Sequence, residues 1–478
     1  MIRKLVISGI LLVTLFFQTN AQKKWTLEEC INYALENNIQ IKQSKLSSES
    51  DKITLLQNKL GVLPNLNGGA SYSSNWGRNI DPTSNTYSND QTQSVSLSLN
   101  SSIDLFSGFQ KINSIKQSEY NYQASKYDVE KMKNDIALRI AQAYMLILFN
   151  KEQLDVSTNQ VEITKMQVNR IKILVEAGAQ AKGVLYDIQA QEALEESNVV
   201  SAQNQLDLSY LDLVQLLDLK SKDGFDIVKP DINTGNEVAL IPTSQIFAYS
   251  SKVMPEIKSA ELRLNSAFSG LSIARGGRYP SLTLSGYYGS NYADNFLDYS
   301  HATVTPTGTT SLTPYVVQGT MTPVLQNLYN IEYQKMSFKD QLNNNLSKSL
   351  RLTMTIPIFN NYQVNSAIAK AKLNTLNADY NLQLQKNQLY KNIEQAATDA
   401  NGAFKSFNAS QKAVDSYKEA FTYIQEKFNV GMVNTIDYND AKNKLIKAES
   451  DMLKAKYNYE FKKVILNFYQ GNPLTLNK

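Results

Sequence analysis

The sequence has 478 residues, with 48 Lys and Arg against 44 Asp and Glu, which gives a formal net charge of +4. This near balance gives no electrostatic reason to expect a nucleic-acid groove, because such a groove needs a clustered basic face. A single cysteine, Cys30, and a single histidine, His301, exclude an intrachain disulfide framework and a Cys/His zinc site, so we predict no enzyme, metal or cofactor.

The N-terminal segment has the pattern of an export signal. Arg3 and Lys4 precede an apolar run from Leu5 to Phe17, and the small residue Ala21 precedes the expected cut. This pattern predicts a secretory signal peptide over residues 1–21, and an uncleaved N-terminal anchor is the alternative. The rest of the chain has no apolar run near 18 residues, so we expect an exported protein that does not span a membrane by helices.

The sequence repeats itself at a constant offset. Residues 103–115 resemble residues 356–368 at an offset of 253 residues, and Gly178 and Gly431 are related by the same offset. Pro64 and Pro280 match at 216, so the second copy carries a 37-residue insertion between Pro280 and Ile356. We predict a first repeat over 22–219, a linker or equatorial region over 220–245, a second repeat over 246–471 and a tail over 472–478.

Each repeat combines long helices with a pair of strands. Thr26 and Glu29 form the pattern of a capping box, and a helix is expected from there to about Gly61. Alternation of apolar and polar residues follows, and its apolar members are Val95, Leu97, Leu99, Ile103, Leu350, Leu352, Met354 and Ile356. Such alternation is typical of a half-buried soluble hairpin or of a lipid-facing barrel strand, and the pattern leaves both open.

Few helix-breaking residues interrupt the segments that follow the strands. From Phe106 to Gly178, and again from Phe359 to Gly431, the chain runs 72 residues, about 105 Å if helical. Gly178 and Gly431 supply the positive φ that a turn needs. The predicted fold is mainly α with a small β part, built from duplicated, long, antiparallel helical hairpins and four strands per chain.

The number of strands indicates an oligomer if the strands cross a membrane. A closed transmembrane barrel needs at least about eight strands, and lipid does not tolerate open sheet edges. Three chains would supply a shared barrel of twelve strands. The alternative is a secreted coiled-coil structural protein.

Three segments of the sequence together resemble a known protein family. The opening helix reads WTLEECINYALENN over residues 25–38, the second half begins with YPSL at 279–282, and the returning helix reads AKYNY at 455–459. Their order and spacing resemble the outer membrane efflux protein family, the TolC-like export channels, and the segment IPIF at 356–359 resembles the Bacteroidetes-type branch.

The resemblance implies a homotrimer with a twelve-stranded β-barrel in outer membrane lipid and an α-helical barrel in the periplasm. It implies the passive exit duct of a tripartite efflux pump for small molecules, drugs or metals. The implied partners are a periplasmic adaptor (membrane fusion) protein and an inner-membrane pump of the RND or ABC type, with no nucleic acid. An exit duct for type I protein secretion is the alternative within the same family.

The resemblance also assigns roles to residues near the two turns. Asp437 and Asp440 lie three apart on one helix face, which by itself is compatible with a solvated face. By resemblance they line the periplasmic aperture together with Asp187, and the family's aperture arginine would fall at Val433. The adaptor would dock on the hairpin tips, whose residues are Gly178, Ala179, Val430, Gly431 and Met432.

Overall fold

The computed structural model describes residues 24–80, 87–89, 91–221, 224–230, 241–320 and 322–474. The predicted signal peptide lies outside these residues, as do parts of the predicted linker and tail. The chain divides into two compact units. The helical unit comprises residues up to 54, 118–267 and 374 onwards, and the strand unit comprises 55–117 and 268–373.

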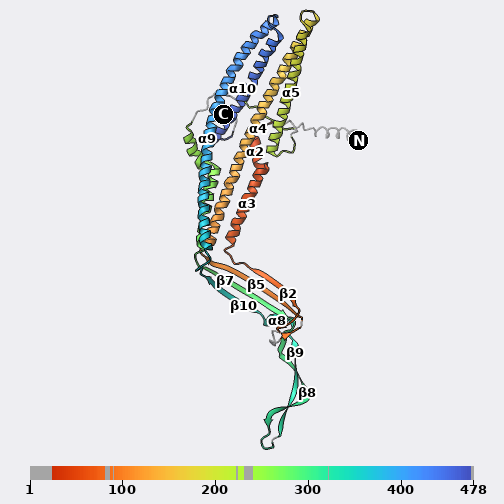
Figure 1. Ribbon diagram of the computed structural model, residues 1–478, viewed down its shortest axis with the longest axis vertical. Coiled ribbons are helices and arrows are strands. Elements are labelled where there is room, and N and C mark those ends of the chain that lie inside the picture. The colour runs from red at the N-terminus through yellow and green to blue at the C-terminus, as the bar shows by residue number, and fades with distance from the viewer. Residues whose placement is uncertain are drawn as a thin grey trace, which may run out of the picture. The chain divides into compact units, whose positions relative to one another are not determined.

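Long helices paired in two hairpins form most of the helical unit (Figure 1). The first hairpin consists of α4 (Gln110–Glu176) and α5 (Lys182–Leu217), and the second consists of α9 (Gln363–Asn429) and α10 (Thr435–Tyr469). Both α4 and α9 have 67 residues, while α5 has 36 and α10 has 35. Four shorter helices are α2 (Leu27–Asn37), α3 (Ile39–Leu60), α6 (Thr243–Val253) and α7 (Pro255–Gly276).

The N-terminal helix begins as predicted and breaks where no break was expected. The Thr26 hydroxyl accepts a hydrogen bond from the Glu29 N–H, and the Glu29 carboxylate accepts one from the Thr26 N–H, so the capping box is confirmed. The predicted continuous helix is wrong, because Asn38 separates α2 from α3. The Asn38 carboxamide oxygen accepts from the Gln40 N–H at 2.9 Å, and its amide nitrogen donates to the Leu216 carbonyl at 2.8 Å. The side chain thus caps α3 and ties the break to α5.

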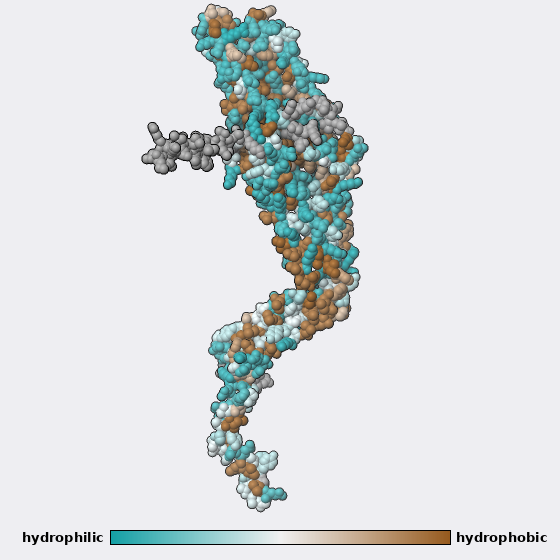
Figure 2. Space-filling view, turned by 180° about the vertical axis from the view of Figure 1, so that it is seen from behind, coloured by the Kyte–Doolittle hydropathy of each residue, from teal (hydrophilic) through white to brown (hydrophobic). Residues whose placement is uncertain are grey.

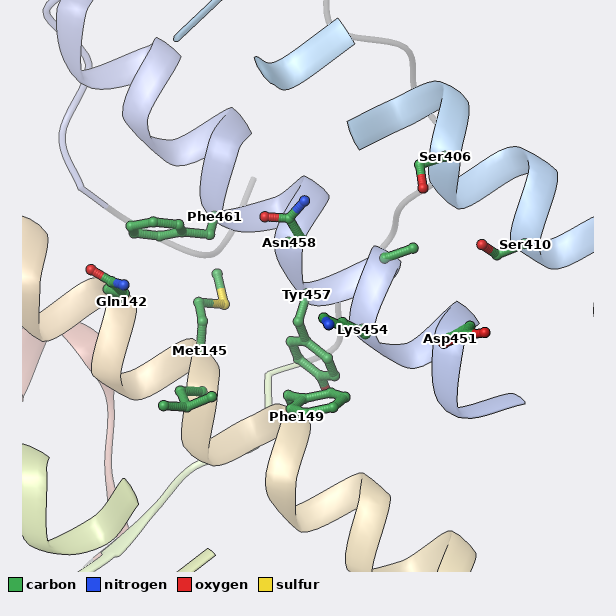
Figure 3. Close-up of a pocket in the computed structure, with 12 residues that line it drawn as sticks. Gln142, Met145, Phe149, Ser406, Ser410, Asp451, Lys454, Tyr457, Asn458 and Phe461 are labelled. Carbon is green, nitrogen blue, oxygen red and sulfur yellow. The ribbon is translucent and has the colours of Figure 1, made fainter. Parts of the chain in front are cut away.

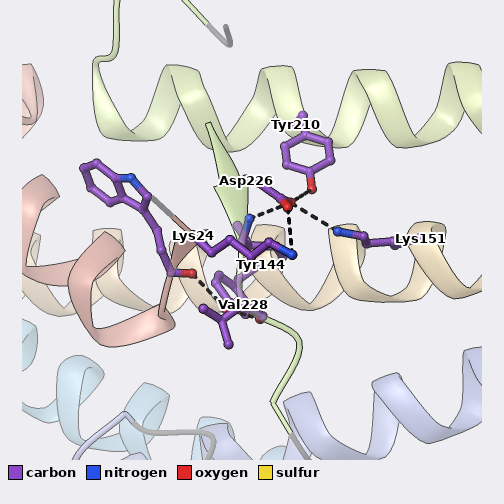
Figure 4. Close-up of polar contacts among 8 residues, drawn as sticks. Lys24, Tyr144, Lys151, Tyr210, Asp226 and Val228 are labelled. Atoms are coloured by element: carbon purple, nitrogen blue, oxygen red, sulfur yellow. Dashed lines mark hydrogen bonds and ion pairs between the residues drawn. The ribbon is translucent and has the colours of Figure 1, made fainter. Parts of the chain in front are cut away.

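A short parallel strand pair anchors the described part of the predicted linker (Figure 4). β1 (Lys24–Trp25) pairs with β6 (Asp226–Ile227). The Asp226 carboxylate accepts from the Tyr210 hydroxyl at 2.6 Å and from Lys151 at 3.2 Å. Burial alone would raise the pKa of Asp226, but these bonds and one from the Ile227 N–H hold that pKa below its usual value.

An antiparallel sheet in the order β10-β7-β5-β2 forms most of the strand unit (Figure 1). Its strands are β2 (Asn67–Asn75), β5 (Thr92–Ser107), β7 (Ser281–Ala293) and β10 (Ser347–Thr355). The alternating strand that we expected to include Ile356 ends at Thr355, since Pro357 cannot donate a ladder hydrogen bond. Within the chain, β2 and β10 are the outer strands of this sheet, so each keeps one edge unpaired.

The predicted loop insertion is a long hairpin. β8 (Leu297–Val316) and β9 (Pro323–Lys335) form an antiparallel pair, and the short helix α8 (Phe338–Asn344) leads from β9 to β10. A minor pair, β3 (Asn79–Ile80) with β4 (Tyr87–Ser88), completes the strand unit. None of the helices described combines the length and the hydrophobicity needed to cross a membrane.

Candidate functional site

The two hairpins turn at the predicted glycines with the same geometry. Gly178 has φ +75° and Gly431 has φ +79°, and a Cβ at either position would meet no atom within 4 Å. The Gly178 and Ala179 N–H groups donate to carbonyls of the last turn of α4, at 3.0 and 2.8 Å. Those of Gly431 and Met432 do the same at the end of α9, at 3.1 and 2.9 Å. Backbone conformation, not packing, therefore requires glycine at both turns.

Apolar side chains stand exposed beside the second turn. Val430 is 71% and Met432 is 73% exposed. In the first hairpin Ala179, which corresponds to Met432, is exposed beside the turn residue Gly178. These positions are available to a partner, and the docking at them stays a prediction.

The three predicted aperture carboxylates are exposed side chains on two helices. Asp437 lies in the first turn of α10, where its N–H donates to the side chain of the capping residue Asn434 at 2.8 Å. Asp440 accepts from Lys444 one turn later at 2.6 Å. Asp187 lies on α5 and is also exposed. Their role at an aperture stays a prediction.

An arginine that the sequence analysis did not assign links the two hairpins. Arg170, near the end of α4, donates to the side chain of Asn429 and, at 3.3 Å, to its carbonyl. Asn429 is the last residue of α9. An arginine eight residues before a predicted turn was a signal in the sequence, but its partner lies 259 residues away and could not be inferred locally.

A buried ion pair also joins the hairpins and was not predicted. Lys442 of α10 donates to the Glu195 carboxylate of α5 at 2.8 Å, and the two side chains are only 3% and 4% exposed. The Thr164 hydroxyl of α4 is hydrogen-bonded to both groups. Burial lowers the pKa of Lys442, and the Glu195 carboxylate opposes that effect. The ion pair and Thr164 therefore link three helices, α4, α5 and α10, which belong to both hairpins. The two charges are buried away from water.

Aromatic packing supports the same junction. The ring of Tyr438 stacks on Phe428 with centroids 4.6 Å apart, and Phe428 packs against a cluster of the first hairpin. The buried members of that cluster are Val168, Ile171 and Ile188. The end of the second hairpin is thus packed onto the first by apolar as well as polar contacts.

A groove of about 640 Å³ lies further along the hairpins (Figure 3). Its lining includes Met145 and Phe149 of α4, Ser406 of α9, and Asn458 and Phe461 of α10. None of the predicted site residues lines it. Among the described residues, no group of three or more His, Cys, Asp or Glu side chains could hold a metal ion.

The register sorts the sheet of the strand unit into two faces, since residues paired across strands share a face. One face is largely apolar, with Ala70, Tyr72, Val95, Leu97, Leu99, Ile103, Leu282, Leu284, Tyr288, Leu350, Leu352 and Met354, and it also carries Ser101, Ser290 and Lys348. The other face is rich in hydroxyl and amide groups: Ser96, Ser98, Asn100, Ser102, Thr283, Ser285, Ser349 and Thr353. In Figure 2 apolar side chains are densest at one end of the strand unit, and the rest of the unit shows a mixture of polar and apolar ones.

Comparison with known proteins identifies the family. The sequence matches the outer membrane efflux protein family over residues 30–218 and 316–472. It is 23% identical to the outer membrane protein TolC of Vibrio cholerae over 438 residues, which cover 91% of this chain and 87% of that one. It is 26% identical to the outer membrane protein TolC of Escherichia coli over 108 residues, which cover 23% of this chain and 22% of that one.

Solved structures of channels share the fold. CusC superposes with a TM-score of 0.73 at 16% identity, over 96% of each chain. The outer membrane channel CmeC of Campylobacter jejuni superposes with a TM-score of 0.71 at 19% identity, over 95% of this chain and 87% of that one. The outer membrane protein VceC of Vibrio cholerae gives a TM-score of 0.71 at 14% identity, over 94% and 96%.

This chain belongs to the outer membrane efflux protein family. The predicted family and the predicted mainly helical fold with few strands are confirmed. The family consists of passive channels of the outer membrane that serve transport, and it is not an enzyme family.

Proposed function

We propose that three copies of this chain form a channel through the outer membrane, which serves as the passive exit duct of a tripartite efflux pump for small molecules, drugs or metals. The observation that carries the proposal is the four-stranded sheet, with one apolar face and two unpaired edges, in a chain of this family. Lipid does not tolerate unpaired edges, and four strands are too few to close a barrel. Three sheets joined at the edges of β2 and β10 would close a barrel of twelve strands.

The two faces of the sheet give such a barrel its orientation. The apolar face, with Leu97, Leu352 and Met354, turns outward to lipid. The face with Ser98 and Thr353 turns inward to a water-filled lumen. This is the alternation of lipid-facing and lumen-facing positions that transmembrane strands show.

The hairpins form the wall of an α-helical barrel in the periplasm. The equal lengths of α4 and α9 support two repeats, over 22–219 and 246–471, that alternate around the axis. In a trimer, Asp437, Asp440 and Asp187 each become a ring of three carboxylates, and such rings attract cations at an aperture.

The tips offer the docking site for a periplasmic adaptor, which connects the duct to an inner-membrane pump of the RND or ABC type. The exposed Val430 and Met432 around Gly431 support this assignment, because exposed apolar side chains at a projecting turn suit a protein partner. The transported substrate comes from the partner pump, which supplies the energy.

Outer-membrane fractions test the proposal directly. We expect a trimer that resists mild detergent and dissociates on heating, and stepwise currents when the purified trimer enters a planar bilayer. Leu352→Lys should destabilise the inserted trimer by about 2–4 kcal/mol if it faces lipid at the midplane, whereas Thr353→Lys on the opposite face should cost far less. A soluble monomer without channel activity, or equal effects of the two lysines, would contradict the proposal.

A further inference from the structure

The ribbon formed by β8 and β9 is amphipathic. Its register pairs Val304 with Ile331 and Leu312 with Leu325, so these side chains share one face. Thr303 pairs with Glu332 on the other face, where the Asn330 amide also donates to the Glu332 carboxylate at 3.1 Å. The apolar members of this face are Ala302, Val304, Pro306, Leu312, Leu325, Tyr329, Ile331 and Tyr333, and its polar members are Thr310, Asn327 and Lys335. The opposite face carries the polar residues Thr303, Thr305, Ser311, Gln326, Asn330 and Glu332 and the apolar residues Val324 and Leu328.

Within the described chain the apolar face has no cover. Leu312 is 71%, Leu325 58% and Ile331 50% exposed. At the base of the ribbon the Met336 N–H donates to the Phe296 carbonyl at 2.9 Å, and this bond joins the two ends of the hairpin. An isolated two-stranded ribbon is marginally stable in water, and apolar side chains exposed together on one face mark an interaction surface.

The apolar face of the ribbon does not lie in the lipid bilayer. A transmembrane strand needs about 9–11 residues, which β7 and β10 already supply with 13 and 9. β8 adds 20 residues and β9 adds 13 between them. The ribbon therefore extends beyond the bilayer, where its threonine-rich face is suited to water.

We propose that the apolar faces of the three ribbons in a trimer pack against one another above the outer mouth of the barrel and narrow it. The inference rests on the trimer proposed above. β7 and β10 are neighbours in the sheet, so each chain delivers its ribbon to the same rim. Threefold symmetry then brings three copies of one apolar surface around a single axis, where each covers the next and the polar faces turn to water.

Disulfide trapping on intact cells tests this packing with two neighbouring positions. Ile331→Cys places a thiol on the apolar face, and Asn330→Cys places one on the polar face of the same strand. The natural Cys30 is fully buried, and burial raises the pKa of its thiol to about 12, so it should stay silent to mild oxidants and maleimides. Each variant is oxidised, probed with a membrane-impermeant maleimide, and run on a non-reducing gel.

The proposal expects Ile331→Cys to give a covalent dimer of the chain and little maleimide labelling, and Asn330→Cys to give labelling without the dimer. A heat-dissociable trimer in which both cysteines label fully and neither crosslinks would overturn the packing while leaving the channel intact. A disulfide to a different protein would overturn the identity of the partner. Loss of the trimer from the unmodified chain would overturn both the channel and the ribbon packing.

Discussion

Lys442→Met tests whether the buried ion pair holds the two hairpins together. The pair lies between α5 and α10, with Lys442 and Glu195 at 2.8 Å and almost no solvent around either side chain. Methionine keeps most of the unbranched aliphatic volume of lysine, so the packing loss should be small. The main cost comes from Glu195, which stays buried without its cation.

Removing one partner of a buried pair typically costs about 3–5 kcal/mol, and we expect a destabilisation in that range. The chain offers a matched control two residues away. Lys444 pairs with Asp440 at 2.6 Å, but the side chains are 56% and 60% exposed. Lys444→Met should therefore cost no more than about 1 kcal/mol.

Equilibrium denaturation at fixed protein concentration measures both changes, because the stability of an oligomer depends on concentration. A third variant, Lys442→Met with Glu195→Met, removes both charges and should recover most of the loss. Since the pair joins the two hairpins, Lys442→Met should also raise single-channel conductance in planar bilayers. Equal destabilisation by Lys442→Met and Lys444→Met would refute the reasoning.

Three further changes test other parts of the molecule. Asp437→Ala with Asp440→Ala should lower cation selectivity or raise conductance in planar bilayers, and unchanged currents would count against the aperture assignment. Burial raises the pKa of Glu460. Between the pKa of the unfolded chain and this raised pKa, the folded chain therefore keeps a proton that the unfolded chain releases. The stability that this proton contributes is lost as pH rises through the raised pKa. Glu460→Gln should therefore raise the unfolding midpoint at about pH 7.5 and change it little at about pH 4.5, and the same gain at both pH values would contradict that sign. Gly431→Ala should cost about 1–2 kcal/mol in denaturation experiments from the left-handed backbone alone, because its Cβ meets open space, and a cost near zero would show that the turn relaxes.

Local patterns predicted much of this fold. The capping box at Thr26, the turn glycines Gly178 and Gly431, and the alternation around Leu352 depend on neighbouring residues, so the sequence alone carries them. The break at Asn38 was missed because its side chain acts through a tertiary contact, the bond to the Leu216 carbonyl. The paired partners of such contacts are far apart in the sequence, and no spacing rule reveals them.

The ribbon was missed for a different reason. Its first strand contains threonine, proline and glycine, which are typical of loops, so the sequence predicted an insertion there but no strands. The second strand, however, alternates apolar and polar residues over Tyr329, Ile331 and Tyr333, and this short period was visible in the sequence. The alternation was present on the second strand only. The amphipathic face becomes visible only when the pairing of both strands is known.

The links between the hairpins break the symmetry that the repeats suggest. At the offset of 253 residues, Lys442 corresponds to Gln189 and Glu195 corresponds to Ala448, so the buried pair occurs once per chain. Arg170 likewise corresponds to Tyr423, which cannot donate as a guanidinium does. In the proposed trimer, these contacts lie at the three boundaries between the two hairpins of one chain. The three boundaries between hairpins of neighbouring chains lack the equivalent residues, so other side chains have to make the contacts there. A wall of six similar hairpins would therefore have two kinds of boundary between hairpins, which differ in the charged side chains buried at each.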